Sequence, residues 1–509
     1  MYLTQSLHHA VQWAPDRPVT VFGDRVRTAR ESAERVARLA GGLRGLGVGA
    51  GERVAILSPN SDRYHELLYA VWWLGAVAIP VNTRWSVKEI GYSLQDSGAT
   101  ALALDASFAA MLPDLREKCP TLRTVVHCAE SGSTPQDTVD YEELATSASP
   151  VGDCRAGGET LALLLYTGGT TGVPKGVMVS HRNMMTNSMG SQVATGGSVR
   201  GGVNLITAPL FHTGGLSGWN RQNLVGGTHV FLPSFTPTAF LEAVARHQVT
   251  TVALIPTMIQ MVCDHPESTK FDLGCVRSLS YGGSAISEAV MNRALDVFPH
   301  ARLSQAFGMT ETGVITNLLH EAHLAGGARM RSAGQAAPHA DVKIVDAAGA
   351  AQPPGTVGEI VTRGDHVMPG YWNKPVETGQ ALRDGWMHTG DAGYLDEGGF
   401  LYVVDRIKDM IISGGENVYS AEVENALATH PAVALCAVIG VDDDTWGQRV
   451  HAVVTLRPGA TATDDELRAH TKSLIAGYKA PRTVEIAESL PLSSAGKILK
   501  RELRARGDQ

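Results

Sequence analysis

Hydrophobic positions along the first hundred residues follow two alternating periods. Residues 29–46 place apolar side chains at helical spacing, and residues 53–57 form the short apolar run that is typical of a buried strand. The same pattern continues with helices at 63–74 and 86–97 and strands at 77–81 and 101–105. Helices and strands that alternate in this way predict a largely parallel sheet covered by helices.

This rhythm is interrupted and then resumes. Residues 129–160 are rich in Ser, Gly, Asp, Thr and Pro, so we expect a loop region there. Further on, we expect strands at 205–209, 228–232 and 251–255, a glycine-rich loop between the first two, and a helix at 237–247. Residues 337–401 carry shorter runs and many Gly/Pro turns, which predict a small β-rich subdomain.

The pattern changes again near Lys408. A compact α+β segment follows, with helices expected at 421–429 and 463–475, strands at 435–439 and 451–456, and a last helix after Gly496. We therefore predict two domains, residues 1–407 and residues 408–509. The predicted fold class is α/β, with a large N-terminal domain of stacked α/β sheets plus the small β-rich subdomain, followed by a small α+β C-terminal domain.

A segment rich in Gly and Thr separates two short apolar runs. It reads Thr167-Gly-Gly-Thr-Thr-Gly-Val-Pro-Lys-Gly176. Glycines let the backbone approach an anion closely, threonine hydroxyls add donors and Lys175 adds positive charge, so the segment predicts a polyphosphate cradle. A polar hairpin turn is the alternative. The common P-loop is excluded, because Gly176 replaces its Ser/Thr and a strand follows instead of a helix.

Composition narrows the class of protein. The chain has 509 residues, of which 44% are hydrophobic and 18% charged, and this fits a well-packed soluble enzyme with more than one core. A net charge of -8 argues against a general nucleic-acid binder. The six cysteines form no C-x-x-C pair, which disfavours a zinc or redox motif. No signal peptide and no transmembrane segment is recognisable, so we predict a cytoplasmic protein.

Four further segments carry candidate chemistry. Phe307 and Glu311 lie close together, where an aromatic ring offers a surface to a purine and a carboxylate offers a hard oxygen ligand to Mg²⁺. Asp391 follows a tight turn and offers acceptors to ribose hydroxyls, although it is equally suited to closing the turn. Arg406 offers a fixed fork of donors. Lys497 lies on a glycine-containing loop near the C-terminus.

In this order, the segments resemble the adenylate-forming superfamily of acyl-CoA synthetases, luciferases and peptide-synthetase adenylation domains. The matching segments are residues 166–176, 281–285, 307–311, 389–391, 405–417 and 496–497. They cover nearly the whole chain, and the ordered set is far more specific than any one motif. The resemblance implies an enzyme that uses ATP, Mg²⁺ and coenzyme A. A carboxylate attacks the α-phosphorus of ATP to give an acyl-adenylate and pyrophosphate, and a thiol then displaces AMP.

The resemblance also implies a role for each matching residue. The β- and γ-phosphates would be held by Thr167, Gly168, Thr170, Thr171 and Lys175, and adenine would be framed by Gly283, Ser284 and Phe307. Thr310 would contact the α-phosphate, Glu311 would hold Mg²⁺, and the ribose would be bound by Asp391 and Arg406.

The same resemblance makes the C-terminal domain mobile. Lys497 matches the catalytic lysine that this domain delivers, and Lys408 matches the hinge at which the domain rotates. Coenzyme A would contact Gly414, Gly415, Trp446, Tyr478 and Lys479. For Trp446 the alternative is packing, and for Lys479 it is a solvated surface charge.

The acid is the least defined part of this prediction. By the same resemblance, the catalytic His212 and Gly214 lie beside the acyl group, and Trp219 and Met309 are candidate walls. Arg221 is the one nearby cation, and because of it a dicarboxylic acid stays open as a substrate. We predict an apolar pocket for a medium- to long-chain fatty acid. The alternatives are an aryl or phenylpropenoic acid, or a stand-alone adenylation enzyme that charges a carrier protein. The expected partners are small molecules, with no nucleic acid, and a homodimer is left open.

Overall fold

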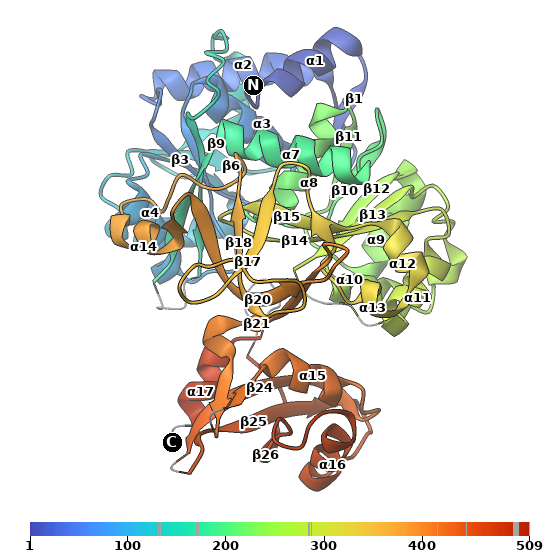
Figure 1. Ribbon diagram of the computed structural model, residues 1–509. Coiled ribbons are helices and arrows are strands. Elements are labelled where there is room, and N and C mark those ends of the chain that lie inside the picture. The colour runs from blue at the N-terminus through green and yellow to red at the C-terminus, as the bar shows by residue number, and fades with distance from the viewer. Residues whose placement is uncertain are drawn as a thin grey trace. The chain divides into compact units, whose positions relative to one another are not determined.

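The computed structural model describes residues 1–509 apart from 131, 133, 169–172, 284, 285, 287, 415, 444, 492–497, 508, 509 and the side chains of 505–507. The chain divides into two compact units (Figure 1). The first comprises Met1–Val342 and Thr362–Met387, and the second comprises Lys343–Val361 and His388–Gln509. The boundary expected at Lys408 falls inside the second unit, and the division into domains at this residue stays a prediction.

The first sheet has the strand order β7-β6-β5-β3-β4-β8-β9 and is parallel except for the β8–β9 pair. In β3, Val54 and Ile56 face one hydrophobic core, whereas Ala55 and Leu57 face another. Helices cover both faces, and this explains the nearly continuous apolar runs of these strands. The strands are β3 (Arg53–Leu57), β4 (Val77–Pro80), β5 (Ala101–Asp105), β6 (Thr124–Cys128), β7 (Val139–Asp140), β8 (Leu161–Thr167) and β9 (Lys175–Ser180). The helices are α2 (Ala29–Gly45), α3 (Asp62–Trp73), α4 (Val87–Ser97), η1 (Ala106–Met111), α5 (Leu112–Lys118) and α6 (Tyr141–Ser147).

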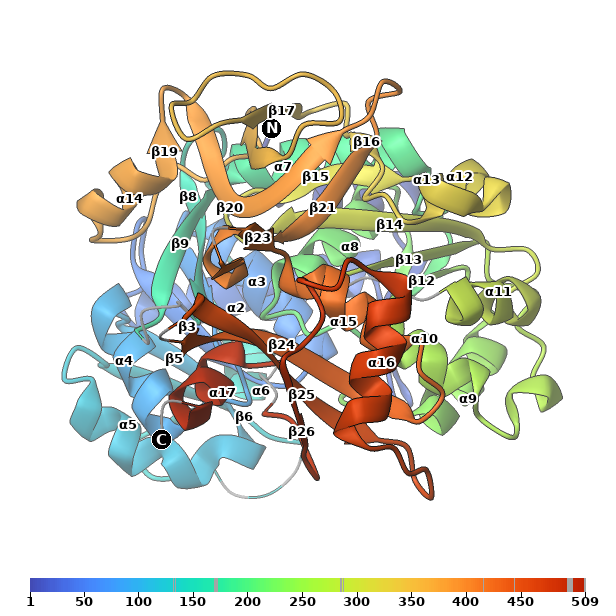
Figure 2. The ribbon, with the colours of Figure 1, turned by 60° about the horizontal axis from the view of Figure 1, so that its bottom comes forward.

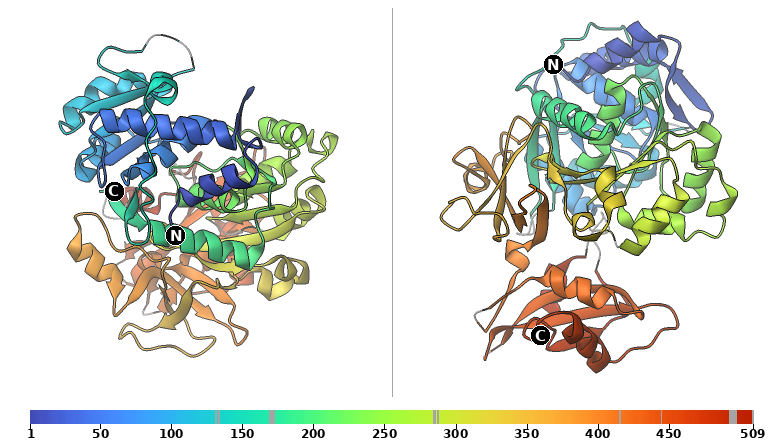
Figure 3. Two further views of the ribbon diagram at one scale, coloured as in Figure 1. Left: turned by 90° about the horizontal axis from the view of Figure 1, so that it is seen from above. Right: turned by 45° about the vertical axis from the view of Figure 1, so that its right-hand side comes forward.

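The second sheet has the order β16-β15-β14-β13-β12-β10-β11-β1-β2, with parallel strands from β14 to β1 and antiparallel strands at both ends. Its strands are β1 (Pro18–Phe22), β2 (Arg25–Thr28), β10 (Val203–Ile206), β11 (Thr228–Phe231), β12 (Thr251–Leu254), β13 (Ser278–Gly282), β14 (Arg302–Met309), β15 (Gly313–Leu318) and β16 (Gln335–Ala336). Its helices are α9 (Pro237–His247), α10 (Pro256–Cys263), η2 (Ser268–Lys270), α11 (Glu288–Val297), α12 (His320–Ala325) and α13 (Gly327–Met330). The N-terminal helix α1 (Gln5–Trp13) lies alongside α2 in the view from above (Figure 3).

Two helices join the cores of these sheets. They are α7 (His181–Thr195) and α8 (Thr213–Leu224), which lie side by side in unit 1. Ser180 caps the start of α7, since its side chain accepts a hydrogen bond from the Asn183 N–H. Because α8 occupies part of the stretch where a glycine-rich loop was expected, that expectation is wrong. Burial of Leu216 and Trp219 in the core stabilises α8 and overrides the low helix propensity of its glycines.

The loop region expected at 129–160 is also interrupted by a helix, α6. Asp140 caps it by accepting a hydrogen bond from the Glu143 N–H, and Tyr141 is buried against the first core. A short helix of this kind has too few periodic positions to be recognised against a polar background.

A third sheet, β17-β18-β20-β19 with β21 on β20, contains residues of both units and includes strands of the predicted β-rich block. Its elements are β17 (Asp341–Val345), β18 (Gly358–Arg363), α14 (Pro375–Ala381), β19 (Leu382–Arg383), β20 (Trp386–Leu395) and β21 (Leu401–Arg406).

The rest of the second unit has an α+β structure, in which helices pack against one sheet. Its sheet, β23-β22-β25-β24 with β26 on β25, packs against α15, as Figure 2 shows. The elements are η3 (Ile407–Asp409), β22 (Ile411–Ser413), β23 (Glu416–Val418), α15 (Ser420–Ala428), β24 (Val433–Asp443), β25 (Gly447–Leu456), α16 (Asp464–Leu474), β26 (Thr483–Ile486) and α17 (Lys500–Gly507). Among the described helices of the whole chain, none has the length and apolar character needed to cross a bilayer.

Candidate active site

The predicted phosphate cradle is the turn of the β8–β9 hairpin. Thr167 is the last residue of β8 and pairs with Lys175, the first residue of β9. This pairing holds the lysine at the base of the glycine-rich turn, next to the exposed Gly168. Thr170 and Thr171 lie outside the described residues, so their predicted contacts stay predictions.

Tyr371 links the cradle lysine to the predicted magnesium ligand. The Lys175 Nζ lies 4.2 Å from the centroid of the Tyr371 ring, and the Tyr371 hydroxyl donates a 2.8 Å hydrogen bond to Glu311 Oε1. The Met368 N–H also donates to the Glu311 carbonyl oxygen at 2.8 Å. A tyrosine ring attracts a cation over its face. One side chain therefore orients both a positive and a negative group of the site.

Sequence reasoning missed Tyr371. Its partner Glu311 is 60 positions away in the chain, so no local pattern joins them. The one hint of Tyr371 in the sequence was Gly370, which stands directly before two aromatic residues. In the structure this glycine has φ 154°. A Cβ at that position would lie 2.7 Å from Thr378 Cγ2, and the close approach therefore requires glycine.

Glu311 has the chemistry that Mg²⁺ requires. It is 8% exposed and accepts a hydrogen bond from Tyr371 at one oxygen, which leaves lone pairs for a cation. The described residues contain no group of three or more His, Cys, Asp or Glu side chains placed to hold a metal ion. Mg²⁺ commonly takes one or two carboxylates and completes its shell with phosphate oxygens and water. Glu311 fits such an arrangement, and its role as the ligand stays a prediction.

The predicted adenine residues come from neighbouring strand ends. Gly282, the last residue of β13, pairs with Ala306 in β14, so Gly283 and Phe307 follow at the same edge. Gly283 has φ 86°, and a Cβ there would meet nothing within 4 Å. Thr310 begins the turn from β14 to β15. The fold thus brings together two segments that sequence motifs had named separately, whereas Ser284 lies outside the described part.

Two of the predicted acyl residues, His212 and Gly214, lie at the start of α8. His212 is the N-cap residue of this helix, and Met309 is the last residue of β14, packed against the first core. Gly214 and Gly218 lie one turn apart on α8, and a Cβ added at either would meet nothing within 4 Å. This face of α8 is therefore open, whereas a Cβ added at the neighbouring Gly215 would lie 2.2 Å from the Pro209 carbonyl oxygen.

Trp219 points away from this open face. Its side chain is fully buried, and its indole N–H donates a 3.1 Å hydrogen bond to His65 Nδ1. Its ring lies 5.3 Å from that of Tyr69 and 6.0 Å from that of His229. Trp219 lies five positions after Gly214 and one position after Gly218. Neither spacing keeps two residues on the same side of a helix, so the Trp219 side chain lies in an aromatic core on another side of α8.

We expect the protein to lose stability between pH 7 and pH 5, because its core contains buried neutral histidines. Burial lowers the pKa of His65 to about 3 and that of His181 and of His366 to about 4, and it holds the pKa of His229 well below the usual value. In the unfolded chain these groups take up protons below about pH 6.5, whereas the folded chain resists protonation. The folded state is therefore favoured fully above pH 6.5 and progressively less as the pH falls toward 4.

The loss amounts to about 1.4 kcal/mol per pH unit for each such histidine, or about 2 kcal/mol at pH 5. Urea unfolding at pH 7 and pH 5 measures it. His65→Gln should reduce the difference between the two pH values by about this amount, and the exposed His300→Gln serves as control. An unchanged pH dependence in His65→Gln would contradict the role of burial.

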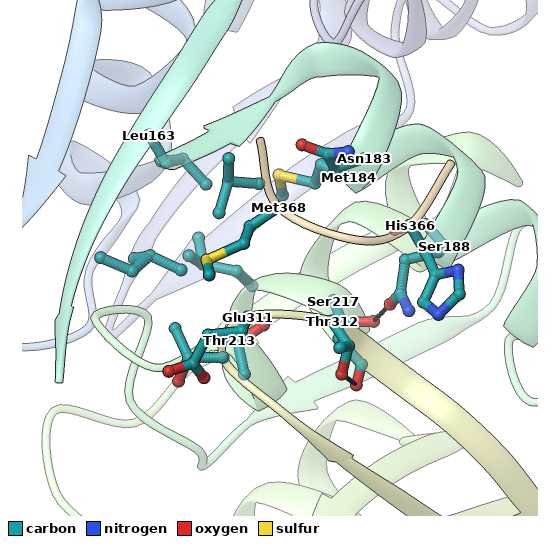
Figure 4. Close-up of a pocket in the computed structure, with 16 residues that line it drawn as sticks. Leu163, Asn183, Met184, Ser188, Thr213, Ser217, Glu311, Thr312, His366 and Met368 are labelled. Atoms are coloured by element: carbon teal, nitrogen blue, oxygen red, sulfur yellow. Dashed lines mark hydrogen bonds between the residues drawn. The ribbon is translucent and has the colours of Figure 1, made fainter. Parts of the chain in front are cut away.

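A small cavity is lined by residues of the Thr310–Gly313 turn and of α7 and α8 (Figure 4). Apolar side chains, including Leu163 and Met368, form one side, and polar groups form the other. On the polar side, Ser217 Oγ donates a 3.1 Å hydrogen bond to Asn187 Oδ1. The cavity measures about 30 Å³, enough for one or two water molecules and too small for an organic acid.

In the second unit, the predicted ribose residues form an ion pair. Asp391 in β20 is paired in register with Arg406 in β21, and the Arg406 Nε lies 2.6 Å from Asp391 Oδ1. The Asp391 N–H also donates to Thr389 Oγ1 at 3.1 Å. The carboxylate is thereby oriented, while the Arg406 side chain remains 43% exposed and accessible to a ligand.

The predicted hinge lies between charged groups of the same unit. Lys408 belongs to η3, and burial, followed by the positive charges of Arg406 and Arg504, lowers its pKa. The adjacent Asp409 opposes this shift and forms a 2.7 Å ion pair with Arg504 of α17. The C-terminal helix is thus bound to the residue that follows the predicted hinge.

The described residues among those predicted to contact coenzyme A all belong to the second unit. The Gly414 N–H donates to the Trp446 carbonyl oxygen at 2.8 Å, and Trp446 is 41% exposed with Arg482 stacked 4.2 Å from its ring centroid. Tyr478 is exposed, whereas Lys479 forms two 2.8 Å hydrogen bonds with Glu422. Lys479 is therefore more than a solvated charge. Gly415 and Lys497 lie outside the described residues.

With this geometry in place, comparisons with known proteins identify the family. The AMP-binding enzyme family matches residues 7–372, and the AMP-binding enzyme C-terminal domain matches residues 422–497. The chain belongs to this family, the adenylate-forming superfamily predicted from its motifs. It is an ATP-dependent, AMP-forming acid–thiol ligase.

Three similar proteins illustrate the range of the family. A feruloyl-CoA synthase from Amycolatopsis sp is 40% identical over 97% of this chain and 96% of its own length. The fatty acid–[acyl-carrier-protein] ligase ScoC from Streptomyces coeruleorubidus is 36% identical over 99% and 96%. The structure of o-succinylbenzoate CoA synthetase from Bacillus subtilis, in complex with its acyl-adenylate, matches with a TM-score of 0.86 and 31% identity over 98% and 97% of the two chains. The predicted fold class is confirmed, and the predicted fatty acid is not.

Proposed function

We propose that this ligase activates an aryl or phenylpropenoic acid, such as a hydroxycinnamate, as its coenzyme A thioester. The observation that carries the proposal is the open face of α8, which begins beside His212 and has no side chain at Gly214 or Gly218. These two glycines are separated by about 6 Å along the helix axis. A slot of this kind accepts a flat ring conjugated to its carboxylate.

Arg221 favours an aryl acid over a long alkyl chain. It lies three residues beyond Gly218, on the same face of α8, and it is buried with a 3.1 Å hydrogen bond to Ser198 Oγ. No carboxylate of the described chain forms an ion pair with it, and burial lowers its pKa to about 10, so it stays charged at pH 7. A buried cation is a poor neighbour for an alkyl tail, whereas a phenol or methoxy oxygen can accept its hydrogen bond.

Relatives support the same assignment. The 40% identity to a feruloyl-CoA synthase extends over nearly the whole chain. A second relative, 36% identical, is a ligase that joins a fatty acid to a carrier protein. The experiment therefore also tests a fatty acid as the substrate and a carrier protein as the thiol.

The residues then act in two steps. The acid's carboxylate oxygen attacks the α-phosphorus, the bond to the bridging oxygen breaks, and pyrophosphate leaves with the electron pair toward Lys175 and the Thr167 end of the cradle. Mg²⁺ on Glu311 would neutralise phosphate charge when bound. Asp391 and Arg406 bind the ribose. In the second step the thiol sulfur attacks the acyl carbon and its proton passes to solvent. The bond from the acyl carbon to the phosphate oxygen breaks, and AMP leaves with the electron pair.

A panel of acids tests the proposal. With ATP and coenzyme A, we expect pyrophosphate release with ferulate, 4-coumarate and cinnamate to exceed that with decanoate, palmitate or malonate by at least about tenfold in kcat/KM. Omitting coenzyme A, or replacing it by a carrier protein, identifies the thiol. A preference for palmitate over every aryl acid would overturn the proposal.

A substitution on the open face sharpens this test. Gly218→Leu should lower kcat/KM for the preferred aryl acid at least about a hundredfold by filling the slot, with the KM for ATP unchanged. Gly379→Leu is the matched control, because Gly379 also lies in a helix, α14, where a Cβ would meet nothing within 4 Å. Equal activity of the two variants would exclude the α8 face as the acyl slot.

A further inference from the structure

A second cavity lies at the opposite end of α8 from His212. It is bordered by the end of α1, the start of β1, the turn at Arg200 and the residues that follow α8. Its volume is about 320 Å³, at the lower end of the range of small-molecule sites, which is about 300–1,000 Å³. None of its lining residues belongs to the predicted ATP, acyl or coenzyme A sites.

The cavity combines an apolar floor with a positive rim. Ala10, Val19 and Val225 supply apolar surface, and the half-exposed Trp13 forms a wall. Arg17 and Arg200 supply the charge.

The indole of Trp13 is itself held in place. His9 stacks on it with ring centroids 5.0 Å apart, and the Arg200 Cζ lies 5.6 Å from its centroid. The wall of the cavity is therefore preformed, and a ligand that enters would meet one edge of an ordered aromatic ring.

Neither arginine of the rim has an anionic partner within the described part of the chain. Arg17 Nη1 reaches the Gly226 carbonyl oxygen only at 3.4 Å, and no described carboxylate forms an ion pair with Arg17 or Arg200. Other arginines of the same unit do have anionic partners, since Arg25 and Arg63 each contact two carboxylates. Arg17 and Arg200 are exposed, and at the rim of one cavity their two guanidinium groups offer charged donors to an anionic ligand.

From this combination we propose that the cavity is a second binding site, separate from the catalytic one, for a small carboxylic acid with an apolar body. Its carboxylate binds Arg17 and Arg200, and its ring or short chain lies on Ala10 and Val19 against Trp13. The volume suits a single aromatic or short alkyl acid and is too small for coenzyme A or an acyl-adenylate. Because Val225 is the C-cap residue of α8 and Gly226 follows it, the ligand lies at the end of the helix whose first turn is at the proposed acyl site.

The test uses the full-length protein with its catalytic site filled by a saturating acyl-sulfamoyl adenosine, a stable mimic of the adenylate. Titration calorimetry with cinnamate should then detect one further equivalent per chain. The double substitution Arg17→Ala, Arg200→Ala should weaken this binding at least tenfold and leave the affinity for the adenylate mimic unchanged. The double substitution Arg246→Ala, Arg331→Ala, at two exposed arginines elsewhere in the unit, should change neither.

Hexanoate, acetate and inorganic phosphate separate the possible ligand chemistries. Cinnamate or hexanoate binding at least tenfold more tightly than acetate and phosphate supports an apolar carboxylate, and the stronger of the two identifies its body. Phosphate binding as tightly as either acid would overturn the proposal, as would the absence of a further equivalent or binding that survives the loss of both arginines. These outcomes do not depend on which acid the catalytic site activates.

Discussion

Glu311→Gln is expected to slow adenylate formation at least about a thousandfold, which corresponds to about 4 kcal/mol of transition-state stabilisation. Glutamine keeps the shape of the side chain, and its amide oxygen can still accept the hydrogen bond from Tyr371. What it loses is the negative charge that would hold Mg²⁺ beside the phosphates. ATP–pyrophosphate exchange with the preferred acid, measured over a range of Mg²⁺ concentrations, gives the effect.

Tyr371→Phe is the graded control for this experiment. It removes the 2.8 Å hydrogen bond to Glu311 but keeps both the carboxylate and the ring beneath Lys175. One hydrogen bond to a charged group corresponds to about 1.5–3 kcal/mol, so exchange should fall by about ten- to a hundredfold and Mg²⁺ should still saturate it. Exchange near the wild-type rate in Glu311→Gln would show that the cation does not depend on this carboxylate.

The local sequence pattern correctly predicted helices and strands whose ends carry characteristic residues, such as a helix cap. The strand expected at 53–57 is β3, and the helix expected at 29–46 is α2, which begins at a capping box formed by Thr28 and Glu31. By contrast, α8 was mistaken for a loop. Its glycines weaken the helical signal, and the buried Trp219 that stabilises it packs against His65 and Tyr69, which are distant in the chain.

The same distinction holds for the candidate site: local motifs predicted some of its residues, and contacts between distant residues define the others. The motifs identified Lys175 and Glu311 because their residue types at short spacing already suggest phosphate and magnesium chemistry. They could not reveal Tyr371, whose contribution exists only after the chain has folded its ring under Lys175 and its hydroxyl against Glu311. Nor could they indicate that Lys479 is engaged by Glu422, 57 positions away.

Lys497→Ala should separate the two half-reactions. We expect adenylate formation to fall at least about a thousandfold, because a lysine that bridges the carboxylate and the α-phosphate acts only while charge develops there. Thioester formation from a supplied acyl-adenylate and coenzyme A should stay within about threefold of the wild-type rate, since this step does not require the bridge. Single-turnover assays of each half-reaction provide the measurement.

The surroundings of Lys497 make this substitution interpretable. The residue itself lies outside the described part, but described residues before and after it in the chain are anchored. The Leu499 N–H donates to the Pro491 carbonyl oxygen at 2.8 Å, and Ile498 packs against a core of the second unit. Three residues on, the Lys500 Nζ lies 2.7 Å from Glu424 Oε1.

Because these contacts do not involve the Lys497 side chain, truncating it should leave the second unit folded. Lys472→Ala, which removes an exposed lysine of α16 in the same unit, is the matched control and should leave both half-reactions unchanged. If Lys497→Ala slowed both half-reactions equally, the lysine would serve the fold or a shared binding step. A selective loss of adenylate formation is instead the result expected of a lysine that stabilises charge in the first step and takes no part in the second.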